Sequence, residues 1–572
     1  MKTHKIWYMC KYTPLELFAG FSCQTERIES VTDSFGYADA AAHPNLCGYG
    51  KALLEACRQP DVDEIVLVNC CDVARRVYDV IKEQGKKSFL YLLDLPHHSG
   101  RAGTWMFESS LRRLVSAYQE YSGIQFDAEK AWEALDAGCG AKKTDSEERT
   151  PFISLQGAHG GPALLKMVSS HFSVPVRDDT CSGNRCLYPL KKPEKAEEFL
   201  RVYSADLIGQ LPCMRMQDTR EREELGRGAL GIVYHTMKFC DYYGFDYADR
   251  VRPGKAPNLK IETDTTRQSE GQLATRLDAF AESLGLNSRA AGNKHGTGTE
   301  SVRGKENNTM NRSGWKYVAG VDSGSTSTDV VIMDQDRKVV AWTIQRTGAG
   351  AAAGAKRALE EAIRKAGIRE DEIGGIVSTG YGRETIGIGD DAVTEITCHA
   401  KGAHYLDPAV RTIIDIGGQD SKVIRIDETG AVRNFTMNDK CAAGTGRFLE
   451  MMARTLEISM EEMETLGENW KEDVTISSMC TVFAESEVVS LVAKNTSLPD
   501  VIHGLNKAVA VKTASLVRRV GMEEAVMMTG GVAKNTGLVR ELENHLGTKI
   551  RVSEYAQLCG AVGAALIAAG EA

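Results

Sequence analysis

The chain has 572 residues, of which 42% are hydrophobic and 26% are charged, and its formal net charge is −9. This balance is typical of globular domains and excludes a largely disordered protein. The acidic charge argues against a general nucleic-acid binder, whose surface would be basic. No apolar run reaches the ~18 residues of a membrane span, and the first residues lack the apolar core of a signal peptide. We therefore expect a cytoplasmic protein of about three or four folding units.

The N-terminal half has an α/β pattern. Residues 64–72 predict a buried strand that runs into a helix over 73–84, and a further strand follows at 88–93. A second strand–turn–helix unit begins at 151–155. This order predicts two Rossmann-like lobes with sites at the carboxyl ends of their strands. The glycines that follow 155 do not form GxGxxG, so a dinucleotide site is not predicted.

Residues 287–314 separate the two halves of the chain. They are rich in Gly, Asn, Ser, Thr and charged residues and contain almost no large apolar side chains. Such a segment cannot bury a core, so we predict a flexible linker here. The predicted domains are then 1–286 and 315–572.

The C-terminal half contains a duplicated β-hairpin. Residues 322–329 (DSGSTSTD) and 415–420 (DIGGQD) occupy equivalent turns at a constant offset of 93 residues. Such self-similarity indicates an internal duplication. Two facing hairpins with glycine-rich tips would clamp a polyphosphate, because glycines let backbone N–H groups approach its oxygens. A third glycine-rich turn, 528–535 (MTGGVAKN), is placed to hold an adenosine.

These turns predict an ATP site. The carboxylates of Asp322 and Asp415 would act through Mg²⁺ or on the attacking water. Gln419 is a further candidate for positioning that water, by analogy of role with other nucleotide hydrolases. The predicted nucleotide-binding residues are Gly324, Ser325, Thr326, Ser327, Gly417, Gly418, Gly530, Gly531 and Lys534.

The three turns resemble those of the actin, hexokinase and chaperone ATPase superfamily. Segments 378–383 (STGYGR), 397–403 (TCHAKGA) and 438–450 (NDKCAAGTGRFLE) resemble the activator ATPases of 2-hydroxyacyl-CoA dehydratases and the ATPase subunits of benzoyl-CoA reductases. The resemblance implies a duplicated actin/hexokinase-type (ribonuclease H-like) fold. It also implies that Cys398 and Cys441 ligate a 4Fe-4S cluster. Since a cubane takes about four thiolates, that cluster would bridge a homodimer. Two further cysteines, at 480 and 559, are interpreted as packing thiols.

Residues 1–285 resemble the 2-hydroxyacyl-CoA dehydratase subunit family, which includes double-cubane cluster proteins. Segments 43–55 (HPNLCGYGKALLE), 71–76 (CDVARR), 238–241 (KFCD) and 260–264 (KIETD) carry this resemblance. It implies a second cluster, either a single 4Fe-4S cubane or a double cubane shared by two chains. Its implied ligands are Cys47, Cys71 and Cys240, with Cys70 as an alternative to Cys71.

Other cysteines and histidines in this half are not interpreted as ligands. Cys181, Cys186 and Cys213 are expected to be loop cysteines rather than ligands. His97, His98 and His159 are expected to make loop hydrogen bonds.

Together the resemblances imply ATP-dependent, low-potential electron transfer in an anaerobe. Reduced ferredoxin or flavodoxin would be the donor, and the acceptor would be the N-terminal domain or a separate dehydratase or reductase. One alternative is an activator ATPase whose N-terminal domain only docks a partner, and another is a small-molecule kinase. The sequence leaves open the final acceptor and whether the N-terminal half binds a CoA thioester.

Overall fold

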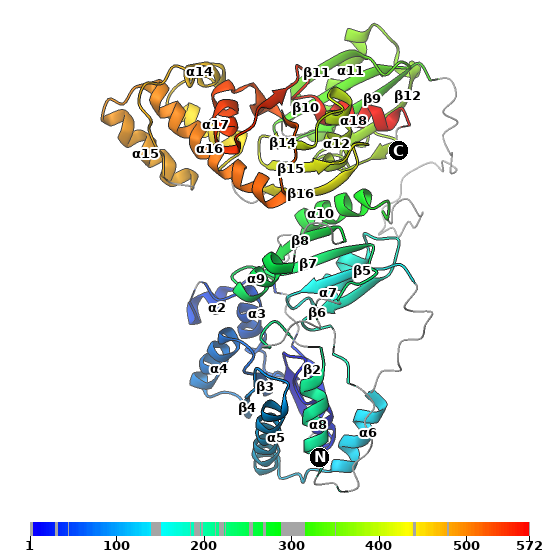
Figure 1. The fold of residues 1–572 in the computed structure, drawn as a ribbon, viewed down its shortest axis with the longest axis vertical. Helices are drawn as coiled ribbons and strands as arrows, with labels where there is room; N and C mark the ends of the chain where they lie inside the picture. Colours follow the sequence, from blue (N-terminus) through cyan, green and yellow to red (C-terminus); the bar gives the residue numbers. More distant parts are fainter. Residues whose placement is uncertain are drawn as a thin grey trace. The chain divides into compact units, whose positions relative to one another are not determined.

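The computed structural model describes most of the chain (Figure 1). The described residues are 4–28, 32–43, 45–138, 150–183, 185–187, 195, 198–211, 213–216, 222, 225–250, 256–266, 270–287, 315–348, 350–438, 442–477 and 480–570. Contacts divide the chain into unit 1 (Met1–Leu277 with Leu284–Asn293) and unit 2 (Asp278–Ser283 with Lys294–Ala572). Nearly all of the predicted linker lies outside the described residues, so the domain boundaries stay predictions.

Unit 1 begins with a four-stranded parallel sheet in the order β2-β1-β3-β4. Its strands are β1 (Lys5–Tyr8), β2 (Gln24–Arg27), β3 (Glu64–Val68) and β4 (Phe89–Leu93). Every residue of β3 is buried, as expected for a parallel strand that helices cover on both faces. The helices of this lobe are α1 (Leu15–Ala19), α2 (Gly36–Ala41), α3 (Gly48–Ala56), α4 (Asp72–Gln84), α5 (Arg101–Ser122) and α6 (Ala128–Gly138).

A second parallel sheet of unit 1 has the order β6-β5-β7-β8. It contains β5 (Ile153–Gly157), β6 (Val176–Thr180), β7 (Gly231–Met237) and β8 (Asn258–Thr263). The accompanying helices are α7 (Gly161–Ser169), α8 (Phe199–Gly209), α9 (Asp241–Arg250) and α10 (Glu270–Ser283). The prediction of α/β lobes with parallel sheets is confirmed.

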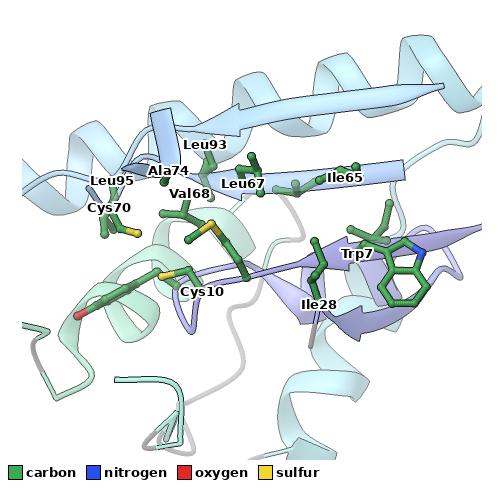
Figure 2. Packing of buried hydrophobic residues seen from close by; sticks show 14 of the residues in the cluster. Trp7, Cys10, Ile28, Ile65, Leu67, Val68, Cys70, Ala74, Leu93 and Leu95 are labelled. Atoms are coloured by element: carbon green, nitrogen blue, oxygen red, sulfur yellow. The ribbon is translucent and has the colours of Figure 1, made fainter. Parts of the chain in front are cut away.

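Cysteines follow the carboxyl ends of several of these strands. Cys10 lies two residues after β1, Cys70 two residues after β3, and Cys181 directly after β6. Figure 2 shows Cys10 and Cys70 at one end of the apolar core that Leu67 and Val68 of β3 help to form. Because carboxyl ends of parallel strands gather at one edge, both sheets deliver thiols to sheet edges.

Unit 2 contains two five-stranded sheets of the same design. Their orders are β11-β10-β9-β12-β13 and β16-β15-β14-β17-β18. In each, three antiparallel strands are followed by two parallel ones. The register shifts between Ile332 and Met333 in β10, and between Arg425 and Ile426 in β15, which are equivalent positions of the duplication. The predicted duplicated actin/hexokinase-type fold is confirmed.

The first sheet of unit 2 consists of β9 (Tyr317–Ser323), β10 (Ser327–Asp334), β11 (Val339–Arg346), β12 (Ile373–Thr379) and β13 (Asp391–Ala392). The second consists of β14 (Thr412–Ile416), β15 (Ser421–Ile426), β16 (Val432–Asn438), β17 (Val526–Thr529) and β18 (Ile550–Val552). The helices are α11 (Ala351–Ala366), α12 (Glu395–Leu406), α13 (Gly446–Thr455), α14 (Met460–Leu466), α15 (Thr481–Ala493), α16 (Leu498–Val520), α17 (Thr536–Leu546) and α18 (Cys559–Ala568). No helix among the described residues has the length and apolarity of a membrane span.

Helix α18 packs closely on strand β9 because its residues are small. A Cβ added to Gly320 of β9 would lie 2.0 Å from the carbonyl oxygen of Ala561 and 2.4 Å from the backbone nitrogen of Ala565. Backbone atoms cannot turn aside as the end of a side chain can. The absence of a side chain at 320 therefore sets the distance between helix and sheet.

We predict that Gly320→Ala lowers the free energy of unfolding by about 1–3 kcal/mol or more, because the added methyl group overpacks this contact. Urea denaturation of the purified chain measures the effect. Gly350→Ala is the matched control, since a Cβ there meets only the Ala353 side chain at 3.9 Å. Its expected change is within about 0.5 kcal/mol. Equal stability of the two variants would contradict the packing argument.

Candidate nucleotide and thiol sites

A cavity of about 310 Å³ in unit 2 collects the predicted nucleotide residues. Of the residues predicted from the sequence, it is lined by Asp322, Gly324, Ser325, Thr326, Ser327, Asp415, Gly417, Gly418, Gly530, Gly531 and Lys534. Gln419 is different, because it is exposed at the tip of its hairpin and does not line the cavity. The next residue, Asp420, takes that place.

Glycine is required where the loops meet. A Cβ on Gly418 would lie 2.2 Å from the Thr326 hydroxyl oxygen, so the tips of the two duplicated hairpins are in direct contact. Gly530 has a φ of +85°, and a Cβ there would lie 2.4 Å from the carbonyl oxygen of Ile416. A side chain at either position would push the loops apart and widen the cavity.

The two predicted catalytic carboxylates have different environments. Asp415 accepts a 2.9 Å hydrogen bond from the Thr529 hydroxyl and lies 3.5 Å from Nδ1 of His399. Burial would raise its pKa, but His399 and Lys422 outweigh this and hold the pKa below its usual range. For Asp322 the compensation by Lys422 is outweighed. Burial, together with the nearby Asp329, raises the pKa of Asp322 to about 7.

Lys422 is a fully buried cation that joins the walls of the cavity. Its ammonium nitrogen lies 2.8 Å from Asp420, 3.2 Å from Asp415 and 3.4 Å from Glu395. Burial would lower the pKa of Lys422, but these three carboxylates raise it well above its usual value. Glu395 is the first residue of α12, so the ion pairs connect this helix to the β14–β15 hairpin.

Several residues that line the cavity were not identified from the sequence. They are Asp329, Tyr381, Glu395, His399, Asp420 and Lys422. A signal for one pair was present, since Asp329 and Lys422 occupy equivalent positions of the 93-residue duplication.

The cavity retains buried polar atoms without hydrogen-bond partners. One carboxylate oxygen of Asp329 and one of Glu395 are such atoms. Burial raises the pKa of Asp329 to about 7 and that of Glu395 to about 8. Unpartnered carboxylate oxygens beside phosphate-binding loops fit a site that receives a hydrated divalent cation with its nucleotide.

Unit 1 contains a second, smaller cavity of about 60 Å³ at the carboxyl ends of its strands. The predicted Cys47, Cys71 and Cys240 all line it. Four further thiols line it as well, namely Cys10, Cys70, Cys181 and Cys213. Cys181 and Cys213, which we expected to be loop cysteines rather than ligands, therefore lie at the same cavity as the predicted ligands, because the fold brings their loops to the same edge. Cys186 is exposed and does not line the cavity.

The thiols interact with one another. Cys70 hydrogen-bonds to both Cys10 and Cys71. The bond between Cys70 and Cys71 lowers the pKa of Cys71 to about 6. On the other side, Cys181 hydrogen-bonds to His159 and Tyr243. Burial opposes the charge, but His159 lowers the pKa of Cys181 to about 6. Both Cys70 and Cys71 therefore belong to the thiol cluster.

The histidines of unit 1 have two kinds of role. The expected loop hydrogen bond of His97 is confirmed, since its Nδ1 lies 2.9 Å from the carbonyl oxygen of Arg215. His159 differs from the prediction. It is partly buried, lines the thiol cavity and stacks on Tyr49 at a centroid distance of 4.1 Å.

Within the described ranges, no three His, Cys, Asp or Glu side chains are arranged to hold a metal ion. A cluster distributes its thiolate ligands over several irons, so they do not converge on a single point. Thiols are the donors that such clusters use. Seven thiols around one cavity therefore suit a cluster better than a single ion.

The described cysteines of unit 2 lie in different environments. Cys398 on α12 is fully buried in an apolar cluster with Val318 and Val562, and burial raises the pKa of its thiol. Cys480 is exposed and immediately precedes α15, so its interpretation as a packing thiol is wrong. Cys559 is buried, as expected. Cys441 lies outside the described residues.

Fold and cavity together define a nucleotide-binding protein of the duplicated actin-like class. A family model described as BadF/BadG/BcrA/BcrD ATPase matches residues 319–568. Another, described as 2-hydroxyglutaryl-CoA dehydratase, D-component, matches residues 10–138 and 133–284. The chain belongs to the BadF/BadG/BcrA/BcrD ATPase family.

Curated relatives support this assignment. The chain is 44% identical over 256 residues to the 2-hydroxyisocaproyl-CoA dehydratase activator of Clostridioides difficile, covering 45% of this chain and 96% of the relative. It is 47% identical over 252 residues to the activator of lactoyl-CoA dehydratase of Anaerotignum propionicum, and the match covers 44% of this chain and 97% of the relative. It is 26% identical over 136 residues to subunit beta of the (R)-2-hydroxyglutaryl-CoA dehydratase of Acidaminococcus fermentans, and this match covers 22% of this chain and 36% of the relative.

We predict that Lys422→Met lowers the free energy of unfolding by about 3–5 kcal/mol, because it leaves the buried carboxylates without their cation. Urea denaturation monitored by tryptophan fluorescence measures this. Lys316→Met is the control, because the ion pair of Lys316 with Glu372 is at the surface. It should change stability by no more than about 1 kcal/mol. A Lys422→Met variant as stable as Lys316→Met would contradict the proposed importance of the buried ion pairs.

Proposed function

We propose that the chain is an activator that uses MgATP hydrolysis in unit 2 to drive low-potential electron transfer to an iron–sulfur centre in unit 1. Reduced ferredoxin or flavodoxin is the proposed donor. The observation that carries the proposal is the occurrence, in one chain, of an activator-type nucleotide cavity and a cavity lined by seven thiols. The relatives named as dehydratase activators support the ATP-dependent part.

In unit 2 the lining of the cavity supports the following proposed roles. Gly417, Gly418 and the hydroxyl groups of the 325–327 loop bind the phosphates, and the 528–535 turn with Lys534 holds the adenosine side. Asp322 and Asp415 hold Mg²⁺ or orient the attacking water. Of the two, Asp415 is kept ionised by His399 and Lys422. Gln419 has no support for a role in hydrolysis, because it lies outside the cavity.

We predict that Asp415→Asn lowers the rate of ATP hydrolysis about 100-fold or more, because the neutral amide neither holds Mg²⁺ nor orients water as a carboxylate does. Release of inorganic phosphate from MgATP is the measurement. Asp336→Asn removes an exposed carboxylate of the same unit and should hydrolyse ATP at the wild-type rate. Unchanged hydrolysis in Asp415→Asn would refute the assignment.

In unit 1 we propose that the thiols ligate the acceptor cluster. Cys47, Cys71 and Cys240 are the proposed core of the ligand set, and the other cavity thiols extend it. Seven thiols exceed the four of a single cubane, which favours a cluster of double-cubane size held within one chain. Such a cluster would supply one-electron transfer. His159, stacked on Tyr49, fixes the wall of the cavity beside Cys181.

A second cluster is proposed at a homodimer interface of unit 2. A shared cluster needs a thiol at the surface of each chain, which Cys480 offers and the buried Cys398 does not. We therefore propose Cys441 with Cys480 as the ligand pair, in place of Cys441 with Cys398. The thiol of Cys480 lies at the N-terminus of α15, where the helix dipole stabilises added negative charge.

We predict that Cys480→Ser lowers the iron content by about two atoms per chain, because half of a shared cubane is lost. Iron and acid-labile sulfide after anaerobic purification are the measurements. Cys398→Ser should keep its iron, since that thiol is buried in the apolar core. The reverse pattern would restore Cys398 as the ligand.

The same measurement tests the thiol cavity. Wild-type chain should contain about six irons with a single cubane in unit 1, and about ten with a double cubane. Cys71→Ser should lose the unit 1 cluster, whereas Cys186→Ser should retain it, because Cys186 lies outside the cavity. About two irons in the wild type would favour the alternative in which unit 1 only docks a partner.

Electron transfer is tested with the holoprotein. Chemically reduced flavodoxin should reduce the unit 1 cluster, seen by electron paramagnetic resonance, only when MgATP is hydrolysed. Reduction at the same rate without nucleotide would refute ATP-driven transfer. A small molecule that accelerates ATP turnover and accepts its phosphoryl group in equal amounts would instead indicate a kinase.

A further inference from the structure

Three arginines line a second hollow beside the nucleotide cavity. The hollow has a volume of about 360 Å³, and its wall includes Arg346, Arg447 and Arg454. Ser325 and Thr326 line both this hollow and the nucleotide cavity. The first phosphate loop is therefore a wall common to the two.

The fold fixes two of the arginines relative to the phosphate loops. Arg346 ends β11, and the next residue, Thr347, donates hydrogen bonds to the carbonyl oxygens of Thr326 (3.0 Å) and Gly324 (2.7 Å). The backbone nitrogen of Arg447 donates a 2.8 Å hydrogen bond to the carbonyl oxygen of Gly418. Both hairpin tips of the nucleotide site are thus tied to an arginine of the hollow.

The third arginine completes one basic face. Arg447 and Arg454 both lie on α13, seven residues apart, and two helical turns place them on the same side. Glu450, between them, also lines the hollow and is its only carboxylate among the described residues. The lining therefore has a clear excess of positive charge.

The three guanidinium groups have no ion-pair partner within the described part of the chain. Other exposed arginines of unit 2 do have one, such as Arg364 with Glu361 and Arg433 with Asp427. Like charges gathered without a counter-ion repel one another, which an anionic ligand would relieve. Guanidinium groups with adjacent hydroxyl donors match the geometry of a phosphate group.

We propose that this hollow is an exit site that binds the inorganic phosphate released by ATP hydrolysis. The proposal rests on the proposed ATPase function. In hydrolysis, water bonds to the γ-phosphorus and the bond to the β,γ-bridging oxygen breaks. ADP keeps that oxygen, and the products are ADP, phosphate and a proton released to solvent. The phosphate then passes the 325–326 loop to the arginines, while ADP stays held by the 528–535 turn.

The test measures phosphate binding without turnover. Inorganic phosphate is titrated calorimetrically into the ADP-loaded full chain. Arg447→Gln/Arg454→Gln should weaken phosphate binding by at least about tenfold, since charge-assisted hydrogen bonds to two guanidinium groups are lost. Arg346→Gln, on a different element, should weaken it as well. Arg364→Gln removes the same charge elsewhere on unit 2 and should bind phosphate as the wild type does.

Product inhibition and the binding of O-phosphoserine distinguish a phosphate exit site from a site for another ligand. Phosphate should inhibit steady-state ATP hydrolysis less in the arginine variants, while ADP affinity and thermal midpoint stay at wild-type values. Equal phosphate affinity in wild type and both arginine variants would overturn the proposal. Arginine-dependent binding of O-phosphoserine without binding of inorganic phosphate would overturn it too, and would assign the hollow to a phosphorylated ligand.

Failure of the proposed ATPase function can be distinguished from failure of the exit site. A wild-type chain that does not hydrolyse MgATP refutes the ATPase, whereas hydrolysis with arginine-independent phosphate binding refutes only the exit site. Weaker binding of flavodoxin by the arginine variants, with unchanged phosphate affinity, would also overturn the exit site.

Discussion

The nucleotide site depends on one buried cation. Lys422 neutralises carboxylates from α12 and from the β14–β15 hairpin, which otherwise would repel one another where they are nearly fully buried. A buried charge of this kind is tolerated only when its partners surround it closely. Lys422 lowers the pKa of both Asp415 and Asp322. For Asp415, together with His399, it outweighs burial, whereas the pKa of Asp322 stays raised, at about 7. The two equivalent aspartates of the duplication thereby acquire different protonation behaviour, as carboxylates with different roles at one site do.

The contact between hairpin tips transmits this arrangement to the rest of unit 2. Gly418 meets Thr326 so closely that the two halves of the duplication touch at the phosphate loops. Backbone hydrogen bonds then connect Gly417 and Gly418 to the start of α13. A movement of the phosphate loops would therefore displace the N-terminus of α13 directly. This offers a physical route from nucleotide state to the segment that precedes α13, where Cys441 occurs in the sequence.

Unit 1 uses a different principle. Parallel strands from two sheets end near one cavity, and thiols that are far apart in the sequence, such as Cys10 and Cys240, line it together. The hydrogen bonds of Cys70 to two neighbouring thiols show how densely they are packed. Packing of this kind would suit the polynuclear centre that we propose, because each iron needs its own share of thiolates.

The sequence by itself determined the local parts. Turns such as 322–329 and 415–420 each consist of consecutive residues, so the sequence shows them directly. Their glycine content and the 93-residue repeat predicted the hairpins, the fold class and the phosphate-binding loops of the nucleotide cavity. Tertiary structure decided what depends on contacts between distant segments. Lys422 reads as an ordinary strand lysine until the fold surrounds it with carboxylates, and Cys181 reads as a loop thiol until two sheets bring it to Cys71. Burial likewise separated Cys398 from Cys480, because exposure is a property of the packed chain and not of the residues beside a cysteine in the sequence.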